Sequence, residues 1–315
     1  MIEVVKYSKA NKEQWDEFVA NANIQSFLFF RDYMEYHKDR FEDYSLMIFE
    51  KRTLKLILPA NVVDNKLYSH QGLTFGGFFT NKQISYQKWI NYLNAINIFL
   101  KNYGISEVSI KLPPFFYSSS LAQSILPIMH LNQTKTDRCE AGSFIRTKDF
   151  HFPRKCVKSG KLELFKEEYS HDFQSFWNLL EINLMERHNT KPVHTIDEIQ
   201  LLAQLFPQNI KLYLLKDITN NEIMGGSVLF SSKGILKVQY FATSHIGRKN
   251  RVSDVLYYNI IRNHLDTKDF IDFGSSMNIK TKKVCKNLLS AKEKFGASTF
   301  PIYTFSYSTS IHFDF

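Results

Sequence analysis

The stretch NIKLYLLKDITNNEIMGGSVLFSSKGILKVQYFATS, residues 209–244, decides how we expect this chain to fold. It contains three apolar runs rich in β-branched and aromatic residues, at 209–217, 222–232 and 234–244, and short polar turns separate them. Runs of this kind predict strands, and the short turns between them predict an antiparallel meander. An amphipathic helix pattern over 252–265 follows the third run.

The segments around the meander predict alternating helices and strands. Upstream, Thr195 stands three residues before Glu198, which is the spacing of a capping box at the start of a helix. The elements that we expect on either side are a strand at 161–168, helices at 172–188 and 195–206, a strand at 268–274, a helix at 281–296 and a strand at 300–308.

The first half of the chain repeats this rhythm. We expect a strand at 2–7, a helix at 11–22, strands at 44–50 and 54–60, a helix at 84–104 and a strand at 106–114. The segment 148–160 between the halves is basic and has no periodicity. The sequence therefore predicts two domains, an N-terminal one over 1–150 and a C-terminal one over 151–315.

Composition narrows the classes of partner. The chain has 315 residues, and 40 Lys and Arg against 31 Asp and Glu give a net charge of +9. A basic balance favours anionic partners such as nucleic acid, phosphorylated sugars, nucleotides or an anionic membrane face. A lysine-rich genome would produce the same balance without any such partner, so charge by itself does not choose among them.

Several site classes lack a signal in this sequence. Three cysteines without C-x-x-C spacing argue against a disulfide framework, and no His, Cys or carboxylate spacing indicates a metal site. The sequence has neither G-x-S-x-G nor G-x-x-x-x-G-K. The start lacks an apolar signal-peptide core, and the apolar runs are far shorter than the ~20 residues of a spanning helix. We expect a cytoplasmic protein with no stable membrane insertion.

The order of the expected elements resembles the fold of the Gcn5-related N-acetyltransferases (GNAT), in which helices precede a three-stranded meander and strand–helix pairs follow it. Two such units in tandem suit the length. The resemblance implies an α+β chain with a tandem GNAT fold, in which helices flank two mixed sheets. In that superfamily a glycine-containing loop after the fourth strand holds the coenzyme A pyrophosphate. The matching frame here is 248–253, where Arg251 and Ser253 replace the glycines.

More specific segments resemble the FemAB family, the aminoacyl-tRNA-dependent peptidyltransferases of peptidoglycan bridges, and their GNAT-domain relatives in Bacteroidetes-like genomes. FIDFGSS (270–276) together with AKEKFGAS (291–298) is the most specific pair. The other segments that carry the resemblance are ERHNTKPVHTIDEIQLLAQLFPQNIKLYLL (186–215), GGSVLF, VQYFATS and DVLYYNIIR in the second half, and WDEFV, QSFLFFRDYMEYH and YSHQGLTFGGFF in the first.

The resemblance implies acyl transfer from a tRNA 3′ end to an amino group. It places Lys292, within AKEKFG, at the position of a lysine that holds the acyl donor, and Arg187 at that of a basic residue that contacts acceptor phosphate. It implies no tightly bound cofactor, and leaves aminoacyl-tRNA and acyl-CoA as alternative donors. The implied partners are a phosphorylated or nucleotide-linked envelope precursor and tRNA.

The residue types support such chemistry independently of the resemblance. Acyl transfer needs a deprotonated amine and stabilisation of the oxyanion. Asp272 lies near the end of a buried-looking strand, where sites of open α/β sheets concentrate, although it could equally bond backbone N–H groups. Lys292 and Asp272 are therefore the candidate catalytic residues. The candidate substrate-binding residues are Arg187 and the adjacent His188, Gln239 and Tyr240 on the third meander strand, Ser275 after Asp272, and His70 and Gln71 in the glycine-rich segment of the first half.

Three functional hypotheses follow. The first is a FemAB-like acyltransferase that acts on an amino group of a cell-envelope precursor or surface sugar. The second is an acetyl-CoA-dependent amino-sugar N-acetyltransferase, and the third is a non-catalytic protein of this fold that binds RNA or a phosphosugar. If Lys292 stabilises the negative charge that develops in the transition state, Lys292→Ala should lose activity and keep the melting temperature, whereas Lys294→Ala should keep both.

Overall fold

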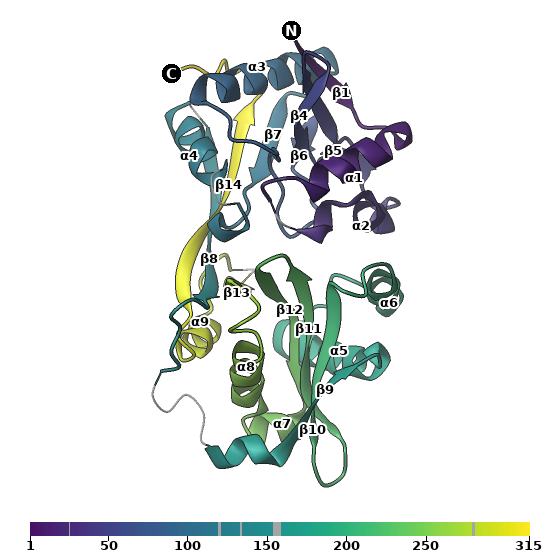
Figure 1. Ribbon diagram of the computed structural model, residues 1–315, viewed down its shortest axis with the longest axis vertical. Coiled ribbons are helices and arrows are strands. Elements are labelled where there is room, and N and C mark those ends of the chain that lie inside the picture. The colour runs from purple at the N-terminus through teal and green to yellow at the C-terminus, as the bar shows by residue number, and fades with distance from the viewer. Residues whose placement is uncertain (25, 119–120, 133, 154–158, 279–280) are drawn as a thin grey trace. The chain divides into compact units, whose positions relative to one another are not determined.

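The computed structural model describes residues 1–24, 26–118, 121–132, 134–153, 159–278 and 281–315. Within these residues the chain forms two compact units (Figure 1). The first unit comprises Met1–Glu140 and Pro301–Phe315, and the second comprises Ala141–Phe300.

The division between the units differs from the one expected at residues 150 and 151. It falls inside two long strands, β8 (Lys135–Arg146) and β14 (Ser298–Ser308), so the chain returns to the first unit for its last fifteen residues. The reason is strand pairing, because the end of β14 pairs with β7 (Glu107–Lys111) in an antiparallel register that joins Thr304 to Lys111. Periodicity marks a strand but does not name its partner.

The first unit contains two sheets, one in the order β1-β3-β4 and one with β2, β5, β6, β7 and the end of β14 as successive neighbours. Its helices and strands, apart from short 3₁₀ turns, are β1 (Ile2–Lys6), α1 (Lys12–Ala20), α2 (Arg31–Met34), β2 (Glu42–Asp43), β3 (Leu46–Glu50), β4 (Thr53–Leu58), β5 (Asn61–Val63), β6 (Lys66–Tyr68), α3 (Tyr86–Asn102), β7 and α4 (Leu121–Leu131).

Three asparagines fix the C-terminal tail onto the helices of the first unit. On α3, the Asn94 side chain accepts a hydrogen bond from the backbone N–H of Phe313 and donates one to its carbonyl, at 2.8 and 2.9 Å. Asn97 donates to the Ile311 carbonyl at 2.9 Å, and Asn132 exchanges two hydrogen bonds with the backbone of Asp314. Phe313 is fully buried in the same hydrophobic core as α3. These contacts explain why the last residues belong to the first unit.

The second unit is built on one mixed sheet in the order β8-β13-β12-β11-β10-β9. The expected meander is confirmed, because β10 (Ile210–Asp217), β11 (Ile223–Ser232) and β12 (Ile235–Thr243) pair antiparallel in sequence order. The remaining elements are β9 (Phe165–Ser170), α5 (Phe173–His188), α6 (Ile196–Leu205), α7 (His245–Lys249), α8 (Val252–Arg262), β13 (Phe270–Ser275) and α9 (Lys286–Glu293).

Two successive glycines in β11 let helices pack closely on both faces of this sheet. A Cβ on Gly225 would lie 3.0 Å from Val252 of α8, and a Cβ on Gly226 would lie 3.1 Å from Phe176 of α5. Because successive side chains of a strand point to opposite faces, α8 and α5 cover opposite faces of the sheet, as Figure 1 shows. The expected capping box is present at the start of α6, where Thr195 and Glu198 bond reciprocally.

Several expected elements differ from the structure. The helix expected at 281–296 begins only at Lys286, because Val284 forms a β-bridge with Met277 and the Cys285 N–H bonds the Ser276 carbonyl. The segment expected as a strand at 161–168 starts in a 3₁₀ turn before β9. The sequence prediction missed α4, which contains Pro127, and β8, whose first half is exposed and lacks apolar alternation. None of the helices in the described ranges is both long enough and apolar enough to cross a membrane.

Candidate active site

The candidate site lies where β12 and β13 of the second unit separate. The two strands run parallel and pair only over Ile235–Lys237 and Phe270–Asp272, although both continue beyond that point. Just after the last pair, the register between β11 and β12 shifts, and Gln239 is the extra residue of a β-bulge. The Gln239 side-chain oxygen is buried and has no hydrogen-bond partner among the described residues. The strand separation and the bulge thus occur beside an unpartnered polar atom of β12.

A buried ion pair closes the paired part of the two strands. Lys237 and Asp272 are register partners, and Lys237 Nζ lies 3.3 Å from Asp272 Oδ2, with side chains 11% and 2% exposed. Charges removed from water in this way are costly unless they pair, so each group depends on the other. Sequence reasoning identified Asp272 and missed Lys237. The only signal for Lys237 in the sequence is a charged residue within the apolar run GILKVQYF. This signal does not show on which face of the strand the side chain lies.

β13 is irregular after Asp272, because its register with β8 shifts between Asp272 and Ser275, and we call this local bend of the strand the β13 turn. The second carboxylate oxygen of Asp272 accepts a hydrogen bond from the Gly274 N–H at 2.7 Å. Gly274 has φ +66°, a left-handed conformation that glycine adopts without steric cost, and a Cβ there would lie 3.3 Å from the Lys237 amine. Glycine at this position therefore lets the turn close over the ion pair.

Lys292, on helix α9, bonds the same turn. Its side chain is buried, with only 3% of the residue exposed, and its amine donates to the carbonyls of Gly274 and Ser275 at 3.1 and 3.3 Å and to Ser276 Oγ at 2.9 Å. An ammonium group has three N–H donors, so these three acceptors satisfy it fully. Lys292 thus clamps the turn that carries the candidate residue Ser275.

Burial lowers the pKa of Lys292 from 10.5 to about 8, because it penalises the charged form. The carboxylate of Asp272 opposes this change, and the ammonium of Lys237 adds to it. At pH 7 the amine is mostly protonated. It begins to lose its proton at a pH slightly above neutrality.

A second polar pair lies next to the bulge. The Tyr240 hydroxyl lies 2.5 Å from His194 Nδ1 and also accepts from the His194 backbone N–H at 3.3 Å. The Trp177 ring of α5 meets the Tyr240 ring edge-on at 5.0 Å between centroids, which places Tyr240 on the α5 face of the sheet. Sequence reasoning included Tyr240 but not its partner His194, because the segment 189–195 between α5 and α6 has no pattern that places it over β12.

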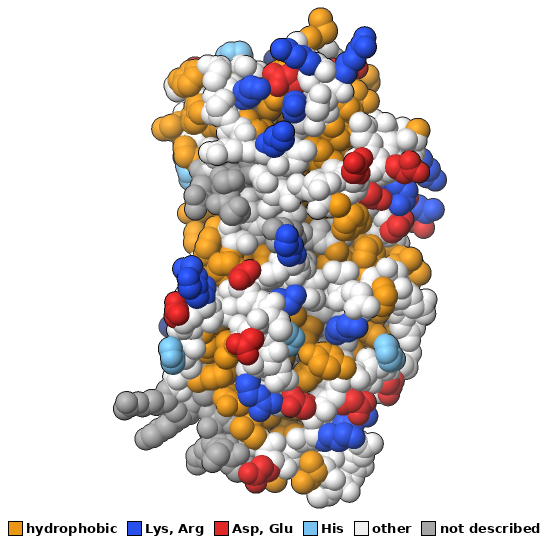
Figure 2. All heavy atoms as spheres, viewed as in Figure 1, with side chains coloured by type: hydrophobic (Ala, Val, Ile, Leu, Met, Phe, Trp, Pro, Cys, Tyr) orange, Lys and Arg blue, Asp and Glu red, His pale blue; other side chains and the backbone are white. Residues whose placement is uncertain are grey.

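In the basic segment after β12, the Arg248 side chain is engaged in hydrogen bonds with other parts of the second unit. Arg248 bonds Glu186 and Asn183 of α5, at 3.3 and 3.4 Å, and the Thr243 carbonyl at 3.3 Å. Arg251 has φ +57°, the left-handed conformation that favours glycine, and Ser253 lies in the first turn of α8. On the face of the second unit visible in Figure 2, basic and acidic side chains are interspersed rather than gathered in one basic patch.

Four further site residues were predicted from the sequence. Among the described residues, no interaction links Arg187, His70 or Gln71 to the site around Lys237, Asp272 and Lys292. Arg187 is exposed near the end of α5, and the side chain of His188 lies outside the described part of the chain. His70 and Gln71 belong to the first unit. There, the Gln71 side chain accepts from Asn61, and the Asn61 side chain accepts from the Gln71 N–H, at 2.9 and 2.7 Å. The described residues contain no group of three or more His, Cys, Asp or Glu side chains that could hold a metal ion.

Solved structures share this fold over almost the whole chain. A crystal structure of FemX covers 97% of this chain and 97% of its own, with a TM-score of 0.68 and 12% identity. A domain described as the C-terminal part of a lysylphosphatidylglycerol synthetase from Agrobacterium fabrum covers 97% of this chain and 92% of its own, with a TM-score of 0.58 and 11% identity. A tandem GNAT protein from the clavulanic acid biosynthesis pathway covers 98% of this chain and 99% of its own, with a TM-score of 0.53 and 7% identity.

These likenesses concern the fold, because the sequence identities are very low. They confirm the expected α+β class, a tandem GNAT fold with mixed sheets flanked by helices, and the structural resemblance to FemAB-like proteins. No family model matches the sequence. No curated protein matches it either.

Proposed function

We propose that this chain is a FemAB-like acyltransferase, whose second unit transfers an acyl or aminoacyl group to an amino group of a cell-envelope precursor or surface sugar. One observation carries the proposal: the buried Lys237–Asp272 pair and the Lys292-clamped turn lie together where β12 and β13 separate. The fold that holds them is shared with FemX and with a tandem GNAT protein.

We assign each residue of the site a separate role in acyl transfer. The acceptor nitrogen attacks the acyl carbonyl carbon, the bond to the donor oxygen or sulfur breaks, and the amine proton goes to a base or to the leaving atom. In this proposal the unpartnered Gln239 oxygen accepts an N–H of the incoming amine, and Asp272, whose oxygens bond Lys237 and the Gly274 N–H, supplies the carboxylate. The Lys237 ammonium provides positive charge beside the developing oxyanion. Lys292 is a positioning residue, because its three donors hold the turn after Asp272.

The loop at 248–253 leads us to favour aminoacyl-tRNA over acyl-CoA as the donor. Arg251 occupies a left-handed position where the coenzyme A loop of the superfamily carries glycine, and Ser253 occupies the second such position. Side chains at these positions obstruct the close approach of a pyrophosphate to backbone N–H groups. Arg248, bonded to Glu186, Asn183 and Thr243, is already engaged by the protein.

Calorimetric titration of the full chain with acetyl-CoA should therefore show no binding in the micromolar range. The double variant Arg251→Gly, Ser253→Gly removes both obstructing side chains and should bind acetyl-CoA measurably more tightly. Lys249→Gly, a change to a neighbouring exposed cation outside the glycine positions, serves as the matched control and should leave binding unchanged. Micromolar binding by the unaltered chain would instead favour the amino-sugar N-acetyltransferase.

Transfer itself is tested by incubating the full chain with a pool of tRNA charged with radiolabelled amino acids and with nucleotide-linked acceptors. The acceptors are a nucleotide-linked muropeptide precursor and nucleotide-linked amino sugars, and acetyl-CoA replaces the charged tRNA in a parallel reaction. We expect label to move from tRNA to an acceptor. Label that moves only from acetyl-CoA would identify the alternative enzyme, and the absence of transfer from both donors to every acceptor would contradict the proposed function.

A further inference from the structure

Three phenylalanines of the second unit lie together on one side of its sheet. The Phe144 ring of β8 lies 6.1 Å from the Phe270 ring of β13 and meets the Phe300 ring of β14 edge-on at 5.6 Å, measured between ring centres. We call Phe144, Phe270 and Phe300 the aromatic patch. Phe300 is buried, whereas Phe144 and Phe270 are only half-buried. The patch therefore retains apolar surface that a ligand can contact.

The patch and the carboxylate of the candidate site lie on the same face of the sheet. Ile145 and Ile271 belong to the hydrophobic core around α8. Phe144, Phe270 and Asp272 adjoin these two residues in sequence, and successive side chains of a strand point to opposite faces. All three therefore lie on the face away from α8, which α5 covers over β11 and β12.

Strand register places the patch directly beside the buried ion pair. Lys237 is the register partner of Asp272, and Asp272 is in turn the register partner of Phe144. The three residues therefore form one row across β12, β13 and β8, in which neighbouring strands are about 4.8 Å apart. Phe270 precedes Asp272 by two residues on β13, which corresponds to about 6.6 Å along the strand. Aromatic rings thus border the carboxylate both across the sheet and along its own strand.

A glycine extends this aromatic surface to a third strand. Gly142 lies two residues before Phe144 on β8 and so faces the same side of the sheet. A Cβ at Gly142 would lie only 2.4 Å from the Cζ atom of Phe300, so the Phe300 ring fills the space that a side chain would need. The absence of a side chain at Gly142 lets Phe300 pack over β8 and join Phe144.

A ligand that contacts both the ion pair and the patch needs a polar centre with a short apolar group attached to it. In the proposed reaction the acyl carbonyl lies beside Lys237 and Asp272. The side chain of a phenylalanyl or leucyl group is about as long as the spacing between neighbouring strands, so it reaches Phe144 and Phe270 from that carbonyl. Aromatic rings pack favourably against such side chains. A glycyl group has nothing to place on the patch.

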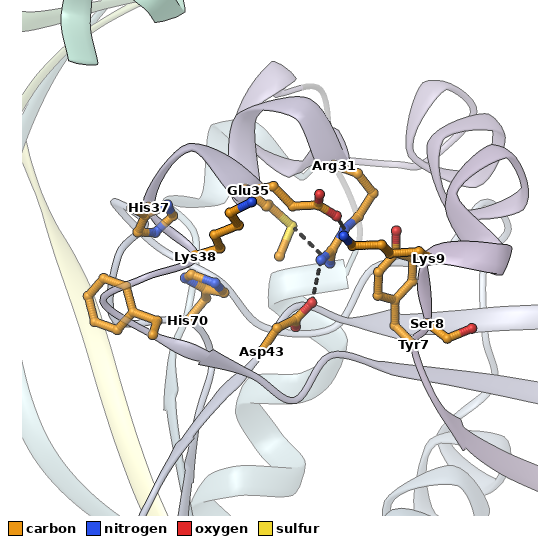
Figure 3. Close-up of a pocket in the computed structure, with 11 residues that line it drawn as sticks. Tyr7, Ser8, Lys9, Arg31, Glu35, His37, Lys38, Asp43 and His70 are labelled. Atoms are coloured by element: carbon orange, nitrogen blue, oxygen red, sulfur yellow. Dashed lines mark hydrogen bonds and ion pairs between the residues drawn. The ribbon is translucent and has the colours of Figure 1, made fainter. Parts of the chain in front are cut away.

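The first unit also contains a pocket, of about 230 Å³, but its lining suits an apolar side chain less well. Figure 3 shows Arg31, Glu35 and Asp43 close together in it, and Arg31 forms ion pairs with both carboxylates. Lys9 and Lys38 add further charge to the lining. An apolar side chain there would take water away from charged groups, which is costly. The aromatic patch is therefore the more favourable surface for it.

We propose that the aromatic patch selects the amino acid that this chain transfers. The transferred aminoacyl group has an aromatic or branched apolar side chain, which lies against Phe144 and Phe270 while its carbonyl lies beside Lys237 and Asp272. The inference rests on the proposed acyl transfer and adds to it the class of the transferred group. The residues of the patch determine specificity, since they contact the side chain and not the reacting atoms.

Calorimetry and ligand-observed NMR on the full chain test the proposal without an acceptor. The probes are adenosine derivatives that carry a phenylalanyl, leucyl, glycyl or lysyl group at the 3′ position through an amide bond, which prevents transfer. We expect the phenylalanyl and leucyl probes to bind at least about tenfold more tightly than the glycyl probe, because their side chains leave water for an apolar surface. The lysyl probe should bind no more tightly than the glycyl probe, since its amine would lose water at the rings.

Three results of this series would overturn the proposal. Equal affinities for all four probes would show that the patch only shields the ion pair from water. Tightest binding of the lysyl probe would show that the rings recognise a cation. No binding of any probe at millimolar concentration would show that the second unit has no site for an aminoacyl group.

Matched variants show whether the patch is the source of the preference. Phe144→Ala and Phe270→Ala each remove one ring beside Asp272 and should abolish most of the preference for the phenylalanyl over the glycyl probe. Phe144→Leu keeps an apolar group and should retain much of it. Phe41→Ala is the control, because Phe41 is also half-buried but lines the pocket of the first unit. With urea unfolding to confirm that each variant is folded, an unchanged preference in both alanine variants of the patch, or its loss in Phe41→Ala, would contradict the proposal.

The inference and the proposed function fail in different ways. The transfer assay with charged tRNA decides whether acyl transfer occurs, and we expect label to move from phenylalanyl-tRNA or leucyl-tRNA. Transfer without any preference among amino acids would overturn the role of the patch and leave the proposed function standing. A binding preference without any transfer would contradict the proposed function and leave the patch as a site for an apolar aminoacyl group.

Discussion

Replacing Asp272 by Asn is expected to reduce acyl transfer about 10²–10³-fold and to lower the free energy of unfolding by about 3 kcal/mol. The loss of activity follows from removing the carboxylate at the reaction site. The loss of stability has another cause, since the Lys237 ammonium would remain buried without its counter-charge. Asparagine keeps the size of the side chain and an oxygen for the Gly274 N–H, so the turn itself should persist.

A second variant separates these two effects. Lys237→Met combined with Asp272→Asn removes both charges, and replacing a buried pair by neutral groups of similar size is often close to neutral for stability. We expect urea unfolding to show recovery of most of the lost stability, while transfer remains as weak as in Asp272→Asn. If the double variant regained activity together with stability, the pair would be structural and the catalytic assignment of Asp272 would be wrong.

Lys292→Met is expected to reduce transfer by about 10²-fold and to destabilise the fold by about 2 kcal/mol at pH 7.5. Methionine fills the aliphatic part of the site, but the carbonyls of Gly274 and Ser275 and the Ser276 hydroxyl lose their shared donor. The turn would then be free to shift. Because the transferred group is held by other residues, kcat should fall more than KM rises.

The stability difference for Lys292→Met should grow as pH rises. The folded protein releases the Lys292 proton above about pH 8, whereas the unfolded chain keeps it up to about 10.5. In this window the unfolded state binds more protons, so the free energy of unfolding of the unaltered protein rises with pH relative to the variant. Between pH 7.5 and 9.5 we expect an increase of about 2 kcal/mol, measured by urea unfolding. A difference that stayed constant would show that Lys292 keeps an ordinary pKa.

Lys294→Met is the matched control for both readouts. Lys294 is two residues away, its side chain is 37% exposed, and its amine pairs with Asp254 at 2.6 Å. Exposed pairs contribute little, so this variant should retain activity and change stability by less than about 1 kcal/mol at either pH. The expectation that Lys292→Ala keeps the melting temperature rested on a role in the transition state alone. The structure buries Lys292, and alanine would leave both a cavity and three unsatisfied acceptors.

The sequence by itself predicted the elements with strong local signals. The meander at 209–244 was identified because its apolar runs and short turns specify both the strands and their antiparallel neighbours. The start of α6 was identified because a capping box is a local contact between Thr195 and Glu198. Segments without such a signal were missed, among them β8, which is exposed over half its length. Local patterns therefore determined the tandem GNAT order of helices and strands.

Tertiary structure decided what depends on partners distant in the chain. Lys237 and Asp272 are thirty-five residues apart and meet only because β12 and β13 pair in one register. Lys292 is a buried residue that bonds the end of β13 because α9 brings its amine to the carbonyls of Gly274 and Ser275 and to the Ser276 hydroxyl. The last strand belongs to the first unit because its end pairs antiparallel with β7. Three asparagines also hydrogen-bond the C-terminal tail that follows it. Hydrophobic periodicity records which face of an element is buried, but a buried charge or a sheet edge is stabilised by one specific partner, and only the folded chain brings that partner close.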